Sequence, residues 1–158
     1  MGTYFLDSSV IIKRYVAEKG SAWVMGLCDM AHGHDLYISQ IALVEVVRAI
    51  SIKAQDSYIT LTDRDRLVAM FRRDSRISYG ILPFTDAVCT FAGDLFRSRR
   101  LRSYDAVQLA SVLVLHKEAL LKPASPPIFV TADLRLIPFA TAEGLRIENP
   151  ENYPSAMA

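Results

Sequence analysis

Residues 3–18 read TYFLDSSVIIKRYVAE and place a strand directly before a helix. The short apolar run TYFLD at 3–7 is typical of a buried strand, and it ends on an acid. The segment after it opens with Ser8 and Ser9, which favour a helix N-terminus, and continues in a helical pattern. A strand joined to a helix in this way is the repeating unit of proteins with a parallel sheet.

The same alternation continues along the chain. Four further strands are predicted, at 35–39, 80–84, 126–131 and 145–149. The predicted helices lie at 40–54, from Thr62 or Asp63 to about Arg73, from near Thr85, and around Asp105. Pro83 confines its strand to a sheet edge or to the strand's end, because proline lacks the N–H that a central ladder needs. The pattern predicts a three-layer α/β/α sandwich around a central, mainly parallel five-stranded sheet.

Two of these helices carry apolar residues at helical spacing, which we expect to face the core. The predicted buried positions are Ile41, Val44, Val47 and Ala49 in one helix, and Ala106, Leu109, Ala110 and Leu113 in the other. Residues 1–149 are predicted to form one domain, and residues 150–158 a loose C-terminal tail.

Composition agrees with one globular domain. The chain has 158 residues, of which 51% are hydrophobic and 22% charged, with a net charge of +1. Arginine outnumbers lysine by 13 to 5, and arginine is the better residue for forked contacts to phosphate. Cys28 and Cys89 have no metal-site spacing, so two buried thiols in a reducing compartment are expected.

The sequence also gives an expectation about location. An acid already appears at position 7, and no charged segment followed by a long apolar stretch is present, so no signal peptide is expected. Glu45 and Arg48 interrupt the longest apolar runs too early for a membrane span. We therefore expect a cytoplasmic protein without membrane contact.

Four acids fall where elements of the predicted sheet begin or end. Asp7 ends the first strand, Asp133 follows the fourth, Glu45 lies early in the helix after the second, and Asp105 opens a helix. Ligands of open α/β sheets bind beyond the carboxyl ends of the strands. Each acid alone has a structural explanation: a helix cap for Asp7, a helix dipole for Asp105, a pair with Arg48 for Glu45, and a turn for Asp133.

Together the four acids favour a metal site. Converging carboxylates repel one another unless protons or cations neutralise them, and Mg²⁺ and Mn²⁺ prefer carboxylate and water oxygens. One such ion activates a water, and a second steadies the leaving oxygen of a phosphate ester. Ser8 and Ser9 are interpreted as contacts to metal ligands or metal-bound water, because no basic residue nearby in the sequence would make either one a nucleophile.

Four segments, in order, resemble PIN-domain nucleases, and most of all the VapC-like toxins of prokaryotic toxin–antitoxin pairs. They are YFLDSSVIIKRY, EVVR, RSYDAVQLASV and FVTAD, and the likeness spans 3–148. The resemblance implies an α/β/α sandwich and RNA cleavage that depends on one or two Mg²⁺ or Mn²⁺ ions. It also implies a homodimer and a small cognate antitoxin whose segment enters the active-site groove.

The resemblance assigns the family's acidic quartet to Asp7, Glu45, Asp105 and Asp133. Ser8, Ser9 and Thr131 match the small hydroxyl residues that accompany these acids. The chain departs from the family at Ala132, where many relatives carry Asn, and ADLRL lacks the aromatic residue often found after the last acid. Asp133 is therefore the acid that the resemblance supports least.

Basic residues are expected around this site. The candidates for binding RNA phosphates are Arg97, Arg99, Arg100 and Arg102, which precede Asp105, and Lys13 and Arg14, which follow the first strand. Arg48 is expected either to orient Glu45 or to meet a carboxylate of the antitoxin. Tyr104 is interpreted as half-buried packing rather than as a platform for a base.

Two other functions fit parts of the pattern. One is a receiver-like phosphoacceptor, which would need a phosphorylatable Asp at the end of the third strand and a later Lys; here that strand ends in LPFT. The other is a PIN-like domain that binds RNA or a partner without cutting. A complete acidic quartet argues against it, because a binding module does not need mutually repulsive acids.

Overall fold

The computed structural model describes residues 1–121 and 125–153, and it contains one five-stranded sheet in which every pairing is parallel. The strand order is β3-β2-β1-β4-β5. The strands are β1 (Thr3–Leu6), β2 (Asp35–Ser39), β3 (Gly80–Leu82), β4 (Ile128–Val130) and β5 (Arg146–Glu148). The predicted parallel five-stranded sheet is confirmed, and β3 is an edge strand that ends directly before Pro83, as expected.

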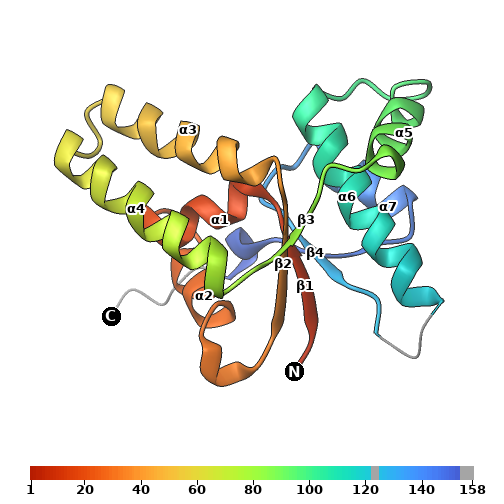
Figure 1. The fold of residues 1–158 in the computed structure, drawn as a ribbon, viewed down its shortest axis with the longest axis horizontal. Coiled ribbons are helices and arrows are strands. Elements are labelled where there is room, and N and C mark those ends of the chain that lie inside the picture. Colours follow the sequence, from red (N-terminus) through yellow and green to blue (C-terminus); the bar gives the residue numbers. More distant parts are fainter. Residues whose placement is uncertain (122–124, 154–158) are drawn as a thin grey trace.

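Helices cover both faces of the sheet, as Figure 1 shows. One layer contains α1 (Ser8–Tyr15), α2 (Ser21–Leu27), α3 (Ala42–Gln55) and α4 (Leu61–Ile77). The other contains α5 (Asp86–Leu95), α6 (Ser103–Leu120) and α7 (Ile137–Ala142). Two short 3₁₀ helices complete the described chain, η1 (Met30–His32) and η2 (Pro150–Asn152). The predicted three-layer sandwich is confirmed.

Alternate residues of the central strands separate two hydrophobic cores. Leu6 and Val130 face the layer of α1 to α4, whereas Phe5 and Phe129 face the layer of α5 to α7. All four side chains are fully buried. Because both faces of the sheet are covered, these strands are apolar on both sides and lack the polar alternation of a half-exposed sheet.

The predicted core positions of α6, Ala106, Leu109, Ala110 and Leu113, are buried. Every other residue from Ala106 to Leu113 is buried too, so this part of the helix is enclosed on all sides. Around α3 the prediction is confirmed in part, because Ile41, Val47 and Ala49 are half-buried against the two cores. In α3 the buried residues are Ala42, Val46 and Ile50, and Val44 is 62% exposed. The first half of α3 is apolar on nearly every side, so its periodicity does not define one face.

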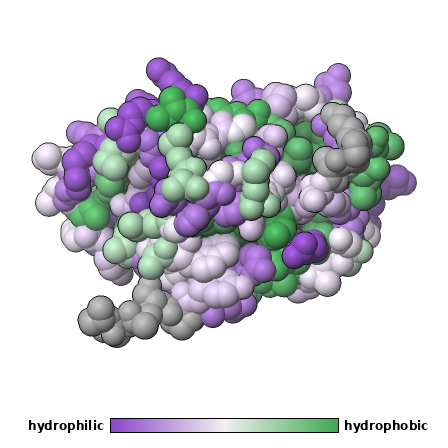
Figure 2. Space-filling view, turned by 90° about the horizontal axis from the view of Figure 1, so that it is seen from below, coloured by the Kyte–Doolittle hydropathy of each residue, from purple (hydrophilic) through white to green (hydrophobic). Residues whose placement is uncertain are grey.

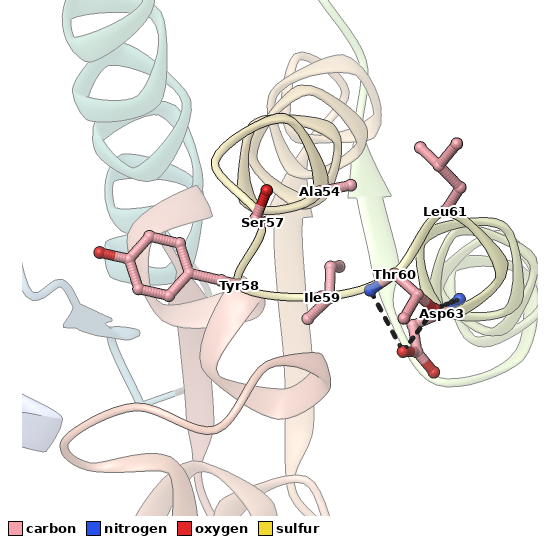
Figure 3. Close-up of a pocket in the computed structure, with 7 residues that line it drawn as sticks. All are labelled: Ala54, Ser57, Tyr58, Ile59, Thr60, Leu61 and Asp63. Carbon is pink, nitrogen blue, oxygen red and sulfur yellow. Dashed lines mark hydrogen bonds between the residues drawn. The ribbon is translucent and has the colours of Figure 1, made fainter.

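Helix α4 begins earlier than predicted, as Figure 3 shows. Thr60 is the N-cap, and its hydroxyl accepts from the Asp63 N–H at 3.0 Å while the Asp63 side chain accepts from the Thr60 N–H at 3.3 Å. This reciprocal capping box replaces the cap predicted at Thr62 or Asp63, and the helix continues to Ile77. The turn from Ala54 to Leu61 lines a shallow pocket between α3 and α4.

Three other expectations meet different outcomes. Cys28 is buried as expected, but Cys89 is exposed on α5. The expected loose tail begins instead with η2, whose Pro150 is buried; residues 154–158 lie outside the described part of the chain. No helix in the described ranges is long and apolar enough to cross a membrane.

Figure 2 looks onto the edge where β1 begins, and hydrophobic and hydrophilic residues are intermixed over that face.

Candidate active site

Asp7 lies at the carboxyl end of β1 and caps α1. Its Oδ1 accepts from the Ser8 N–H at 2.8 Å, and its Oδ2 accepts from the hydroxyls of Ser9 at 2.6 Å and Thr131 at 2.9 Å. The side chain is buried, and burial raises the pKa of Asp7 to about 6 despite the hydrogen bonds from Ser9 and Thr131. The negative charge of Glu45 raises this pKa further. Asp7 is thus a desolvated carboxylate with about one acceptor site left free.

Glu45 lies in the first turn of α3 and is bound by residues of two other helices. Its Oε2 accepts from the Ser8 hydroxyl and from Gln108 Nε2, both at 2.7 Å. Gln108 Nε2 also donates to the Ser8 hydroxyl at 2.6 Å, so the three groups form a closed triangle. The pair with Arg48 that the spacing allowed is not formed, and Arg48 is exposed.

Asp105 is the third residue of α6, in its first turn. Burial raises its pKa, the charges of Asp133 and Glu45 raise it further, and Arg135 and Arg102 lower it. The carboxyl group therefore lies within electrostatic reach of two other acids of the predicted quartet. Negative charge in the first turn of a helix is favourable, but that small gain does not account for acids that face one another.

Asp133 is held by an arginine that sequence reasoning missed. Its Oδ1 accepts from the backbone N–H of Arg135 at 2.9 Å and from Arg135 Nε at 3.0 Å, while its Oδ2 accepts from Arg135 Nη2. These hydrogen bonds lower the pKa of Asp133. The Asp133 N–H donates to the Thr131 hydroxyl at 3.1 Å, which connects Asp133 to Asp7 through one side chain.

Ser8 and Thr131 connect Asp7, Glu45 and Asp133 by hydrogen bonds at the carboxyl edge of the sheet. Asp105 has no such contact, and the charges of Asp133 and Glu45 link it to the group. In Figure 1 this edge lies at the upper centre, between the N-terminal ends of α3 and α6. Carboxylate and hydroxyl oxygens are the donor set that Mg²⁺ and Mn²⁺ prefer. Burial raises the pKa of Asp7 and of Asp105, so the charged form of each is less stable than in water. Within the described residues, however, no three acidic, histidine or cysteine side chains are already grouped as a metal site. Arg135 takes up both oxygens of Asp133, so a cation would compete for them. Ser8 and Gln108 bind only Oε2 of Glu45.

Lys13 and Arg14 do not line this edge, contrary to expectation. Lys13 is only 5% exposed and pairs with Glu151 at 2.9 Å and Glu18 at 3.3 Å. Arg14 donates to the Tyr79 hydroxyl at 2.7 Å and pairs with a carboxylate of α4 at 3.3 Å. Both cations point into the α1-to-α4 layer and stabilise the fold.

The arginines before Asp105 differ in exposure. Arg97, Arg100 and Arg102 are exposed, and Arg99 pairs with Glu143 across to the end of α7. Arg102 occupies the N-cap position of α6, and its charge lowers the pKa of Asp105 and of Asp133. It is thus the arginine of this group with a shown electrostatic link to the acids. Tyr104 is 52% exposed beside Asp105.

Two site residues were not predicted. Gln108 is a polar residue within the apolar run AVQLASV, one turn after Asp105. Arg135 stands two residues after Asp133, close enough for its guanidinium to fold back on that carboxylate. The only signal in the sequence for Gln108 is its polarity at a position where the helix is otherwise buried.

The chain matches the family model described as PIN domain over residues 4–136. The structure of VapBC2 from Rickettsia felis bound to a DNA fragment from its promoter is similar at 14% identity, with a TM-score of 0.62 over 93% of this chain and 98% of that one. The structure of FitAB bound to the IR36 DNA fragment has 14% identity and a TM-score of 0.64, over 94% and 95%. VapBC-1 from nontypeable Haemophilus influenzae has 15% identity and a TM-score of 0.58, over 94% and 98%. These likenesses concern the fold, and no curated protein sequence matches the chain significantly.

Proposed function

The chain belongs to the PIN domain family, and we propose that it is a metal-dependent endoribonuclease acting as the toxin of a toxin–antitoxin pair. The observation that carries this proposal is the set of four acids at one sheet edge, in which Asp7 is buried with its pKa raised to about 6. Such a carboxylate is stabilised by a nearby cation, and acids that share cations suit hydrolysis of phosphate esters.

We assign different roles to the site residues. When bound, one or two Mg²⁺ or Mn²⁺ ions would supply a water of lowered pKa as the nucleophile. Asp7, Glu45, Asp105 and Asp133 present the carboxylate oxygens that would hold these ions. Ser9 and Thr131 orient Asp7 by donating to its Oδ2, and Ser8 orients Glu45. Neither serine is a nucleophile in this proposal, because the metal-activated water takes that role.

The proposed substrate is RNA, bound through its phosphates by the exposed arginines Arg97, Arg100 and Arg102. Arg102 is the leading candidate, because its charge lowers the pKa of Asp105 and of Asp133. An enzyme that cuts RNA in this role would act in the cytoplasm. A further proposal is that it forms a homodimer.

A cognate antitoxin is proposed because the similar structures include VapBC2 and FitAB, and a further similar structure, VapBC-5 from Mycobacterium tuberculosis, is described as a member of the VapBC family of toxin–antitoxin systems. Arg48 is exposed beside Glu45 and is the residue we assign to a carboxylate of that partner. A short neighbouring reading frame with a DNA-binding N-terminus, whose product co-purifies with this chain, would support the proposal.

The receiver-like alternative does not fit the sheet. A flavodoxin-like receiver has the strand order 2-1-3-4-5, in which the third strand is central. Here β3 lies at the edge and ends at Leu82, before Pro83 and Phe84. A non-cutting PIN-like domain remains the competing function, and the activity assay distinguishes the two.

The purified chain is expected to cut single-stranded RNA when Mg²⁺ or Mn²⁺ is added, and EDTA should stop the reaction. Asp105→Asn should abolish cleavage, because it removes a carboxylate ligand. It should leave the melting temperature unchanged or slightly higher, because it also removes repulsion from Asp133 and Glu45.

The matched control is Asp65→Asn, which changes a 70% exposed carboxylate on α4 and should cut at the parental rate. An Asp105→Asn variant that cuts as fast as the parent would show that Asp105 has no catalytic role. A parent that binds RNA but leaves it intact with either ion would favour the non-cutting domain.

A further inference from the structure

Gln108 is a buried amide on an otherwise apolar part of α6. It is 1% exposed, and its neighbours Val107 and Leu109 are buried as well. It lies three residues after Asp105, so both side chains leave α6 on the same side. Through its Nε2 it reaches Ser8 of α1 at 2.6 Å and Glu45 of α3 at 2.7 Å, and thereby connects three helices at the acidic edge.

The chemistry of its neighbours determines how the amide is oriented. An ionised carboxylate only accepts hydrogen bonds, so the NH₂ group of Gln108 has to face Glu45. In this orientation Gln108 Oε1 is buried and has no hydrogen-bond partner among the described residues. A buried carbonyl without a partner is unfavourable, and a methionine of similar length would avoid it. Against this loss stand the two hydrogen bonds that Nε2 donates, so the amide has little net effect on fold stability.

We propose that Gln108 is a positioning residue of the acidic site and acts through Glu45. The inference rests on the proposed function, since it concerns the same metal ligands. The two hydrogen bonds from Nε2 fix the Glu45 carboxylate against the Ser8 hydroxyl and restrict it to one place at the sheet edge. Groups that hydrogen-bond a metal ligand in this way commonly change metal affinity or activity about 10- to 100-fold when they are replaced.

The test compares Mn²⁺ affinity in the full chain by calorimetry and by electron paramagnetic resonance. Gln108→Met keeps the length of the side chain and removes both donated hydrogen bonds. We expect its Kd for Mn²⁺ to be roughly tenfold or more weaker than that of the parent, with a melting temperature close to the parental one. The matched control is Gln55→Met, at the exposed far end of α3, which should change neither quantity. Gln108→Leu is the second variant if the methionine variant does not fold.

A double variant tests the route through Glu45. If Gln108 acts only by holding Glu45, adding Gln108→Met to Glu45→Gln causes no further loss of Mn²⁺ affinity. In RNA cleavage the single Gln108→Met variant should lower kcat and leave KM close to the parental value, because the substrate does not touch the buried amide.

The outcomes separate this inference from the proposed function. Parental Mn²⁺ affinity in Gln108→Met overturns the positioning role, as does additive loss in the double variant. A lower melting temperature with unchanged Mn²⁺ affinity gives Gln108 a structural role and also overturns the inference. A parent that binds Mn²⁺ but cuts no RNA contradicts the proposed function, while the affinity ratio still decides the role of Gln108. A parent that takes up no Mn²⁺ overturns both.

Discussion

Asp7 accepts three hydrogen bonds, yet its negative charge is unfavourable in its buried position. Three donors reach its carboxylate, and hydrogen bonds of this kind lower the pKa of an acid. Burial has the larger effect and raises the pKa to about 6, because the charged form has lost its hydration. Under the proposed function, a bound cation would offset this unfavourable charge.

The raised pKa of Asp7 predicts that the cation-free chain loses stability as the pH rises from about 4 to above 6. The folded pKa of Asp7 is about 6 and its ordinary value is 3.8, so the folded chain holds this proton more tightly than the unfolded chain does. Below pH 3.8, the pKa of Asp7 in the unfolded chain, the proton contributes its full stabilisation. This stabilisation is lost as the pH rises through about 6, the pKa of Asp7 in the folded chain. Two pKa units correspond to roughly 3 kcal/mol, measurable by urea unfolding in EDTA at pH 4 and pH 7.5.

The control for this prediction is Asp7→Asn, which cannot titrate and should show a smaller loss of stability between the two pH values. Adding Mg²⁺ at pH 7.5 should restore stability to the parent and not to the variant. Equal pH dependence of the parent and Asp7→Asn would contradict the assignment of this titration to Asp7.

The four acids could be found from the sequence because each stands at the boundary of an element, and boundary acids of parallel strands meet at one edge. Gln108 and Arg135 could not. Gln108 lies within a helix, and its importance depends on Glu45, which is 63 residues away in the chain. Arg135 lies near Asp133 in sequence, but the direction of a flexible side chain does not follow from spacing.

At the scale of single elements, the N-terminus of α4 gives a direct stability prediction. Thr60→Ala should lower the free energy of unfolding by about 1 kcal/mol, because it removes the hydroxyl that accepts from the Asp63 N–H. Figure 3 shows this reciprocal contact. Urea unfolding of the two chains measures the difference.

Thr62→Ala is the matched control, since Thr62 lies inside the first turn of α4 and is exposed. Alanine has the higher helix propensity, so this change should be neutral or slightly stabilising. If Thr62→Ala lowered the free energy of unfolding more than Thr60→Ala does, the N-cap would be Thr62, as the sequence alone suggested.

Elements with a clear apolar period could be predicted, and those without one could not. The five strands follow from short apolar runs, and the helical spacing found buried residues of α6, although residues 106–113 of that helix are buried on all sides. Helices α2 and α7 are short, with seven and six residues, and tertiary packing rather than periodicity stabilises them. For α3 the composition predicts a helix but not its buried face, because apolar residues surround most of its first half.

At the scale of the whole molecule, residues 150–153 pack against α2 and the turn before it. Gly20 has a positive φ of 86°, and a Cβ there would come within 2.7 Å of the Pro150 carbonyl oxygen, so only glycine fits this approach without strain. Trp23 of α2 stacks on Tyr153 with ring centroids 5.1 Å apart. Residues 150–153 therefore belong to the folded body, although they follow the last strand.

The ion pair between Lys13 and Glu151 makes the stabilising effect of this segment testable. Lys13 is 5% exposed, so its charge depends on the carboxylates of Glu151 and Glu18. Removing one partner of a buried charge is costly, but Glu18 stays within 3.3 Å, so Glu151→Gln should lower the free energy of unfolding by about 1–2 kcal/mol. Glu118→Gln, on the exposed end of α6, is the control and should have almost no effect in urea unfolding at pH 7. Equal stability of the two variants would mean that η2 rests on α1 without stabilising it.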